Sequence, residues 1–115
     1  MRVVHSSQVE AQPVTEAGAR GTTVRWLLSR PEGAPNFTMR LFELGPGGCT
    51  PLHEHSWEHE VFLLAGRLEV VGEPGPAEVS VGDAVLIPPG ERHQFRNIGE
   101  TPARLLCIIP LPRDQ

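Results

Sequence analysis

The sequence predicts an all-β domain, an antiparallel sandwich or small barrel, and three observations support this fold class. Glycine and proline are frequent, at 12 residues each in a chain of 115, so turn-forming residues interrupt the chain every few positions. Short apolar runs recur between these turns, as is typical of antiparallel domains. No segment carries apolar residues at helical spacing over three turns, so long helices are not expected. One domain with a single core fits this length.

Seven apolar runs are the predicted strands, and four segments rich in glycine or proline are the predicted turns. Each run suits a pleated, half-buried surface. The runs cover residues 22–29, 38–44, 60–65, 67–71, 84–87, 93–97 and 103–109, and the turns cover 31–35, 45–48, 72–76 and 88–90. Residues 1–20 are patterned more weakly. We expect them to form an N-terminal arm or edge strand, with residues 21–115 forming the barrel.

Composition and charge exclude several classes of function. The chain has no lysine and no tyrosine, which removes Schiff-base chemistry and the lysine of a phosphate-binding loop. The formal net charge is -4 at pH 7 and the arginines are scattered along the chain, so neither nucleic acid nor an anionic membrane is an expected partner. A small-molecule substrate or ligand is the expected partner.

The N-terminal segment and the cysteines indicate the compartment. Residues 1–14 lack the apolar stretch of about 7 to 15 residues that a secretory signal needs. The longest apolar runs, 61–65 and 105–109, are far shorter than the roughly 20 residues of a membrane-spanning helix. Cys49 and Cys107 are interpreted as reduced thiols in a chain without such a signal. We therefore expect a cytoplasmic location.

Four of the five histidines are the main chemical signal. His53, His55 and His59 lie within seven residues, and His93 follows in a second segment bounded by turns. On one extended strand His53 and His55 point to the same face, but His59 would lie roughly 20 Å from His53. The chain must therefore turn at residues 56–58 for His59 to join them. Two walls of a closed β structure must face each other for His93 to join.

Four neutral imidazoles suit zinc, copper, nickel, iron or manganese, and do not suit calcium or magnesium, which prefer oxygen ligands. Four histidines would fill the coordination of tetrahedral zinc, whereas octahedral manganese or iron would keep two open positions for chemistry. Two alternatives remain open. The histidines are solvated groups at strand ends, or the cluster takes up metal only during purification.

Two motifs resemble those of the cupin superfamily, G-x5-H-x-H-x3,4-E-x6-G and G-x5-P-x-G-x2-H-x3-N. The second motif is complete, with the fixed residues Gly82, Pro88, Gly90, His93 and Asn97. The first has the fixed residues Gly47, His53, His55, His59 and Gly66. His59 stands where the family usually has a glutamate ligand. Glu60 is the alternative ligand, but that alignment leaves five residues instead of six before Gly66.

More narrowly, residues 53–62, with 34–37 and 106–110, resemble small bacterial cupins that bind manganese through four histidines. The resemblance covers residues 38–110 and implies a single-domain double-stranded β-helix, or jelly-roll barrel. It implies one metal per chain, manganese first, then iron, copper, nickel or zinc. The implied ligands are His53, His55, His59 and His93. Exposed strand edges, together with the resemblance, also favour a homodimer.

The residues around the cluster suggest further roles. Glu54, Glu58 and Glu60 lie close to the histidines in sequence, but strand alternation turns all three away from the histidine face. In the absence of lysine, an inward-facing Arg40 or Arg96 would be the anchor for a substrate carboxylate. The candidates for an apolar pocket wall, for most of which core packing is the alternative, are Phe42, Trp57, Ile87, Phe95, Leu105 and Cys107.

The leading functional hypothesis is a mononuclear manganese- or iron-dependent oxidoreductase of dioxygenase type, acting on a small organic substrate in the barrel. Two alternatives stand beside it. One is a non-catalytic module that binds a small ligand or a metal, and the other is a metal-dependent isomerase or decarboxylase. A bound redox metal favours the first hypothesis, whereas stoichiometric zinc counts against it because zinc has no redox chemistry.

Overall fold

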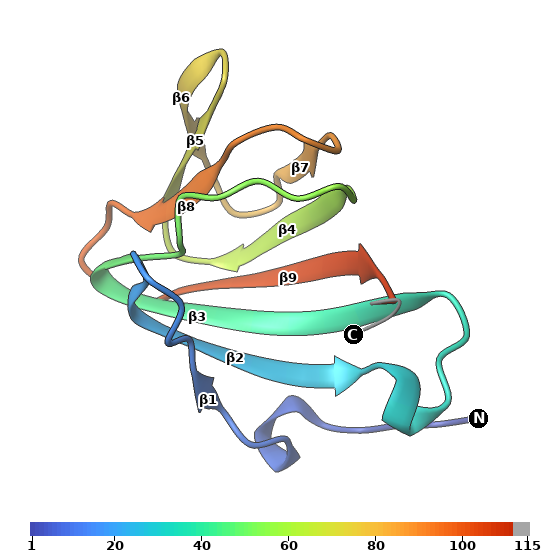
Figure 1. Cartoon of the computed structure of the whole chain (residues 1–115). Helices are drawn as coiled ribbons and strands as arrows, with labels where there is room; N and C mark the ends of the chain where they lie inside the picture. The colour runs from blue at the N-terminus through green and yellow to red at the C-terminus, as the bar shows by residue number, and fades with distance from the viewer. Residues whose placement is uncertain (112–115) are drawn as a thin grey trace.

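Nine antiparallel strands form one curled sheet in the computed structural model, which describes residues 1–111 (Figure 1). Within this range two single turns of 3-10 helix, Ser6–Gln8 and Arg30–Glu32, are the only helical segments. The strands are β1 (Gln12–Pro13), β2 (Arg20–Leu28), β3 (Phe37–Cys49), β4 (His59–Ala65), β5 (Leu68–Gly72), β6 (Gly75–Val79), β7 (Ala84–Ile87), β8 (Gln94–Asn97) and β9 (Ala103–Pro110). The predicted all-β fold class is confirmed.

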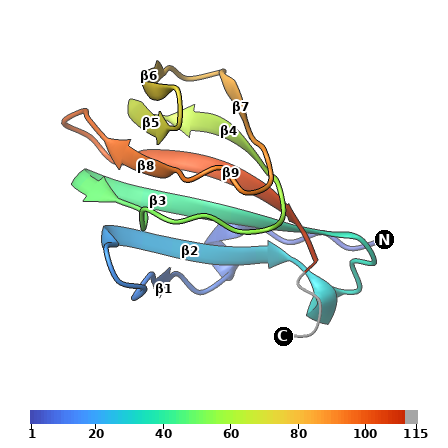
Figure 2. The same ribbon diagram turned by 45° about the horizontal axis from the view of Figure 1, so that its top comes forward.

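The sheet is a partly closed barrel, and β3 connects its two parts. The hydrogen-bonded order is β6-β5-β8-β3-β9-β4-β7, with β2 beside β3 and β1 beside β2. Residues 37–44 of β3 pair with β9, whereas Cys49 at its end pairs with Arg96 of β8. Figures 1 and 2 show β2, β3, β9 and β4 side by side as one wall, with β5 and β6 beyond β8. The sheet thus curls around an interior, as in a jelly roll.

Strand alternation fills this interior with apolar side chains. Along β4 and β9 every second residue is buried, and the residues between them face outward. Val61 and Leu63 of β4 pack in one core cluster with Leu105 and Cys107 of β9. Full burial of one such aliphatic side chain stabilises the fold by about 1.5–3 kcal/mol. The core therefore lies on the same face of these strands as His59.

The predicted turn at residues 45–48 is wrong, because these residues continue β3. A single β2 residue, Gly21, stands opposite all four of them, so the segment is a large bulge in the strand. At Gly48 an added Cβ would lie 2.8 Å from the Gly45 oxygen and 3.0 Å from the Gly21 oxygen. The glycines therefore allow a close backbone approach at the bulge, and they do not reverse the chain.

All seven predicted strands are found with ends shifted by a few residues, and one further strand was missed. β6 begins at Gly75, inside the segment predicted as a turn at residues 72–76. The reversal is shorter than predicted, because Gly72 of β5 already pairs with Gly75 of β6. β6 is mostly exposed, so it has no run of apolar residues that would have revealed it.

Residues 1–20 lie along the outer edge of β2. Gln12 of β1 pairs with Val24 of β2. The Arg25 guanidinium donates to the carbonyl oxygens of Ser6 and Val9 at 3.0 and 2.7 Å.

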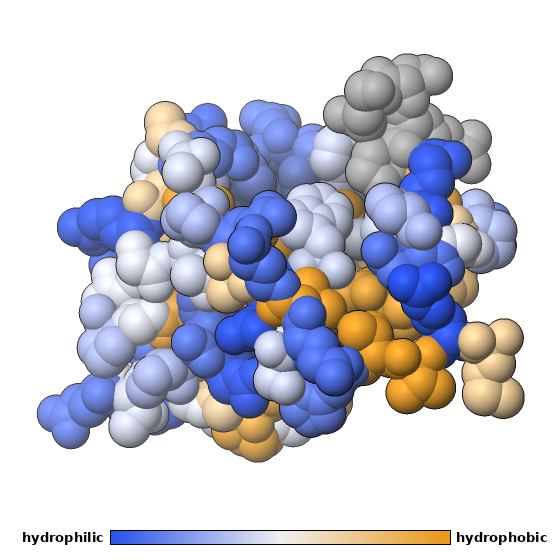
Figure 3. All heavy atoms as spheres, turned by 90° about the horizontal axis from the view of Figure 1, so that it is seen from below, coloured by the Kyte–Doolittle hydropathy of each residue, from blue (hydrophilic) through white to orange (hydrophobic). Residues whose placement is uncertain are grey.

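Figure 3, seen from below Figure 1, shows a hydrophobic patch bordered by hydrophilic side chains on that face. In residues 1–111 no helix is long and apolar enough to cross a membrane.

Candidate metal centre

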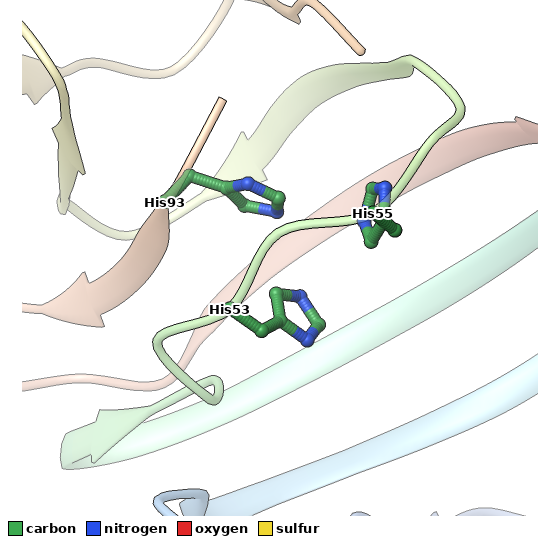
Figure 4. Close-up of side chains that lie close together, drawn as sticks. All are labelled: His53, His55 and His93. Atoms are coloured by element: carbon green, nitrogen blue, oxygen red, sulfur yellow. The ribbon is translucent and has the colours of Figure 1, made fainter. Parts of the chain in front are cut away.

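Three histidines lie together where two segments that are distant in sequence meet. His53 and His55 belong to an irregular segment between β3 and β4, and His93 directly precedes β8 (Figure 4). One ring nitrogen of each lies within 4.8 Å of those of the other two. The amides of His53 and His93 donate to each other's carbonyl oxygens at 3.1 and 2.9 Å. This backbone bridge fixes the distance between the two segments.

His59 brings a fourth imidazole to the cluster from the start of β4. Its Nε2 lies 2.5 Å from His55 Nε2, and its ring stacks on that of His55 with 4.3 Å between centroids. The ring centroid of His93 is 5.0 Å away. The chain bends at Ser56 and Trp57, in the segment where the spacing argument requires a turn. The structure therefore brings the four predicted histidines together, although His53 and His55 do not lie on a regular strand as expected.

One ring nitrogen each of His53, His55 and His93 is held by an oxygen atom, which leaves Nε2 of His53 and of His93 for a ligand, whereas Nε2 of His55 contacts His59 Nε2. In each case the Nδ1–H donates and Nε2 keeps its lone pair, which is the arrangement of metal-binding histidines. The oxygens are a Glu16 carboxylate oxygen 3.1 Å from His53, the Trp57 carbonyl 2.9 Å from His55 and the Glu91 carbonyl 2.8 Å from His93. These bonds hold each ring in one tautomer and one orientation.

His93 provides the test of whether a metal fits this cluster. The side chain is 1% exposed, and its Nε2 is buried without a hydrogen-bond partner. A buried polar atom normally has a partner, because leaving it unpaired costs about 1–3 kcal/mol. A metal ion among the neighbouring imidazole nitrogens would satisfy this lone pair. The all-nitrogen donor set fits zinc, copper, nickel, iron or manganese better than calcium or magnesium.

Burial favours the neutral form of His55, His59 and His93. It is the main cause that lowers the pKa of His59 to about 2, and the positive charge of Arg40 and the neighbouring imidazoles add to the effect. Burial is also the main cause that lowers the pKa of His55 and of His93 below the usual value. Neutral imidazole is the form that binds a metal, so these histidines need not lose a proton first.

An apolar cavity of about 280 Å³ adjoins the cluster, and His53, His59 and His93 form part of its wall. Four of the candidate pocket residues also line it, namely Phe42, Phe95, Leu105 and Cys107. Trp57 does not line this cavity and stacks on the outer side of His55, with 4.6 Å between ring centroids. Ile87 packs in the core cluster instead.

Part of the cavity wall was not expected from the sequence. Glu16, Thr15 and Val14 come from the N-terminal segment, and Trp26 comes from β2. No motif or spacing connects Glu16 to His53, so no sequence signal pointed to this contact. Trp26 could have been predicted, because it lies two residues after the buried Val24 on β2 and so faces the same side of the strand.

The three glutamates that lie close to the histidines in sequence are on the surface. Glu54, Glu58 and Glu60 are exposed. Glu60, the alternative ligand, pairs with Leu86 on the outer face of β4, whereas His59 faces inward. The structure therefore keeps the side chain of Glu60 on the opposite face of the strand from the histidine cluster.

The two candidate arginines are on opposite sides of the sheet. Arg96 is outside, 3.8 Å from the Glu69 carboxylate. Arg40 lines the cavity, and its Nη2 donates to Cys107 Sγ at 3.1 Å. That sulfur lies 3.4 Å from His59 Nδ1, and burial raises the pKa of the Cys107 thiol. Arg40 thus reaches the histidine cluster through one neutral thiol.

Known proteins resemble this chain over most of its length. A family model described as "Cupin domain" matches residues 40–109, more than half of the chain. The structure is similar to that of the polyketide cyclase RemF from Streptomyces resistomycificus, with 39% identity and a TM-score of 0.91 over 100% of this chain and 82% of that one. The predicted resemblance to the cupin superfamily is confirmed.

Two relatives are similar in sequence. A 1-methylthio-D-xylulose 5-phosphate methylsulfurylase of Rhodospirillum rubrum is 35% identical over 77 residues, which are 67% of this chain and 49% of that protein. The polyketide synthase CurC of Streptomyces cyaneus is 34% identical over 102 residues, which are 85% of this chain and 65% of that protein. The chain thus spans about half to two thirds of the length of these relatives.

Proposed function

The chain belongs to the cupin domain family, and on that premise we propose that it is an enzyme with one divalent transition metal held by His53, His55, His59 and His93. The observation that carries this proposal is that ring nitrogens of His53, His55 and His93 lie within 4.8 Å of one another, with His93 Nε2 buried and unpaired. The ring of His59 adjoins this group by stacking on His55. The adjoining apolar cavity gives a small organic substrate a place beside the metal. Manganese is the first candidate, then iron, copper, nickel or zinc.

The protein's own groups prepare this site. The bound metal would supply Lewis acidity toward a substrate oxygen and, with manganese or iron, redox chemistry. Glu16 and two backbone carbonyls hold three of the rings through Nδ1, so that each ring turns its Nε2 away from these oxygens. The apolar walls of the cavity exclude water from a bound substrate and so strengthen electrostatic interactions there.

The first candidate reaction is oxidation of dioxygenase type. Manganese or iron held by His53, His55, His59 and His93 would supply redox chemistry, with dioxygen as the oxidant, to a substrate in the adjoining cavity. A second candidate is cyclisation without net oxidation, which the likeness to the polyketide cyclase RemF favours because it covers the whole chain. Isomerisation or decarboxylation, and a non-catalytic binding module, remain the alternatives.

Elemental analysis of untagged protein tests the metal site. The protein is produced with manganese, iron, copper and zinc supplied and is purified without a nickel column. We expect about one metal ion per chain in the wild type and far less in His59→Ala and His93→Ala. His5→Ala is the matched control, because His5 is exposed and its ring bonds, among residues 1–111, only to Ser7. Low occupancy in the wild type, or equal occupancy in all four proteins, would contradict the proposal.

Oxygen consumption separates the two candidate reactions. Protein loaded with manganese, iron or zinc is incubated with a panel of small enolisable and phenolic compounds in an oxygen electrode. Oxygen uptake that needs manganese or iron supports the dioxygenase-type reaction, because zinc has no redox chemistry. Conversion by the zinc-loaded protein without oxygen uptake supports cyclisation. Ligand binding without conversion under any condition supports the binding module.

A homodimer is part of the proposal. Phe62 and Leu64 of β4 and Leu86 of β7 are 43%, 42% and 59% exposed on the outer face of the sheet. A second copy that packs the same face against them would cover this apolar surface in a two-fold interface. We expect light scattering to give a dimer for the wild type and a monomer for Leu86→Glu. A monomeric wild type would exclude this interface.

A further inference from the structure

Arg40 is a cation without a carboxylate partner in the wall of an apolar cavity. It is half-buried on the inner face of β3. The outward-facing Arg67, Arg96 and Arg104 each pair with a glutamate. Within residues 1–111 Arg40 makes no such pair. Because a charge beside low-dielectric walls is costly unless it is paired, this arrangement indicates a site whose partner is a ligand.

The guanidinium of Arg40 is held in place, but its hydrogen-bonding capacity is not satisfied. Its carbon atom lies 5.3 Å from the ring centre of Trp26 and 4.8 Å from that of Phe42, which are cation-π distances. Its one hydrogen bond within residues 1–111, from Nη2, goes to the sulfur of Cys107, a weak acceptor. Arginine has five N–H donors, so most of them remain for an anionic ligand.

Arg40 lies in the cavity wall next to the histidine cluster. Arg40 and His59 line the same cavity and contact the same thiol, that of Cys107. The other charged side chain in the cavity wall is Glu16, which is bonded to His53 and is 59% exposed, so it lies at the solvent side. Arg40 is therefore the one positively charged side chain among the described residues of the cavity wall.

We propose that Arg40 anchors the carboxylate of the substrate, so that the cavity selects small organic acids with a flat apolar body. The planar guanidinium matches a carboxylate and can donate two parallel hydrogen bonds to it. Trp26, Phe42 and Phe95 supply aromatic walls for the body. The cavity volume of about 280 Å³ is at the lower limit for small-molecule sites. The orientation of the acid toward the metal rests on the proposed function, whereas its recognition by Arg40 does not.

The test compares benzoate with benzamide, which have nearly the same flat shape but differ in charge. Dissociation constants are measured by ligand-observed NMR for the metal-loaded wild type, Arg40→Gln, Arg40→Lys and Arg96→Gln. We expect benzoate to bind about tenfold or more tightly than benzamide to the wild type and to Arg96→Gln. Arg40→Gln should lose this preference, and Arg40→Lys should keep part of it because it keeps the charge.

Three results would overturn the proposal. The first is equal binding of benzoate and benzamide to the wild type, and the second is no binding of benzoate. The third is a preference for benzoate that survives in Arg40→Gln with unchanged metal content, because the metal alone would then bind the carboxylate. The same titration on metal-free protein separates the two proposals. A preference there that depends on Arg40 supports the anchor even where the metal site fails.

Discussion

The two faces of β4 differ in burial and in chemistry. His59 and Glu60 are adjacent in sequence, yet His59 is 7% exposed with its pKa lowered to about 2, whereas Glu60 is exposed on the outer face. β9 repeats the pattern, with Cys107 against the cavity and Ile108 on the outside. One strand thus carries the candidate site on one face and a surface on the other, because side chains alternate with a period of two.

The polar contacts of the two faces differ in the same way. Inside, the contacts of His53, His93 and Arg40 orient a ring or a guanidinium next to the cavity. Outside, the side chains that form the pairs of Arg67 with Glu78 and of Arg104 with Glu43 are 43–58% exposed, and such pairs contribute about 0–1 kcal/mol. Substitutions on the inner face should therefore have larger effects than those on the outer face.

The largest effect on stability is expected at Leu105 of β9, and its neighbour Leu106 is the control. Leu105→Ala removes a fully buried side chain and should lower the free energy of unfolding by about 2–5 kcal/mol. Leu106→Ala, on the outer face, should lower it by about 1 kcal/mol or less. Urea denaturation measures both, with the slope of the transition as a check on two-state behaviour. Equal losses would show that the two faces are not packed as differently as described.

Acid should destabilise the metal-free protein through the inner face. The pKa of His59 falls from 6.5 to about 2 on folding, so the unfolded chain binds the extra proton between these values. The free energy of unfolding should therefore decrease as the pH falls below 6.5, with His59 contributing up to about 1.4 kcal/mol per pH unit. The free energy of unfolding, measured by urea denaturation at each pH, should decrease less steeply with falling pH for His59→Gln than for the wild type and His5→Gln. An unchanged slope would contradict the burial argument.

Glu16→Gln should weaken metal binding without unfolding the protein. The carboxylate accepts a hydrogen bond from His53 Nδ1, and loss of such a partner typically lowers metal affinity about 10–100-fold. Competition with a chromophoric chelator measures the affinity. The control is Glu78→Gln, which breaks the outer pair with Arg67 and should leave metal affinity unchanged. Equal affinities of both variants would show that Glu16 does not act on His53.

The smallest effect is expected for Glu60→Gln on the outer face. Metal content should equal that of the wild type, and the free energy of unfolding should change by less than about 0.5 kcal/mol. Elemental analysis and urea denaturation provide the two measurements. Loss of metal in this variant would mean that Glu60, and not His59, is the ligand from β4.

Local patterns predicted much of the fold and part of the candidate site. Alternation of apolar residues predicted seven strands and the outward direction of Glu54, Glu58 and Glu60. It failed at residues 45–48, where glycines permit a bulge that resembles a turn in sequence, and at the exposed strand β6. Both failures arise because the amino acids of each segment fit more than one structure, and only the neighbouring strands decide which structure forms.

The sequence by itself determined which residues alternate, where the chain can bend and that four histidines lie in two short segments. These properties follow from backbone geometry within a few residues. Only the tertiary structure decided that Glu16 reaches His53 and that Arg40 faces the cavity while Arg96 faces outward. Such contacts join segments that are distant in sequence, and they exist only because the sheet curls and brings its two parts together around one interior.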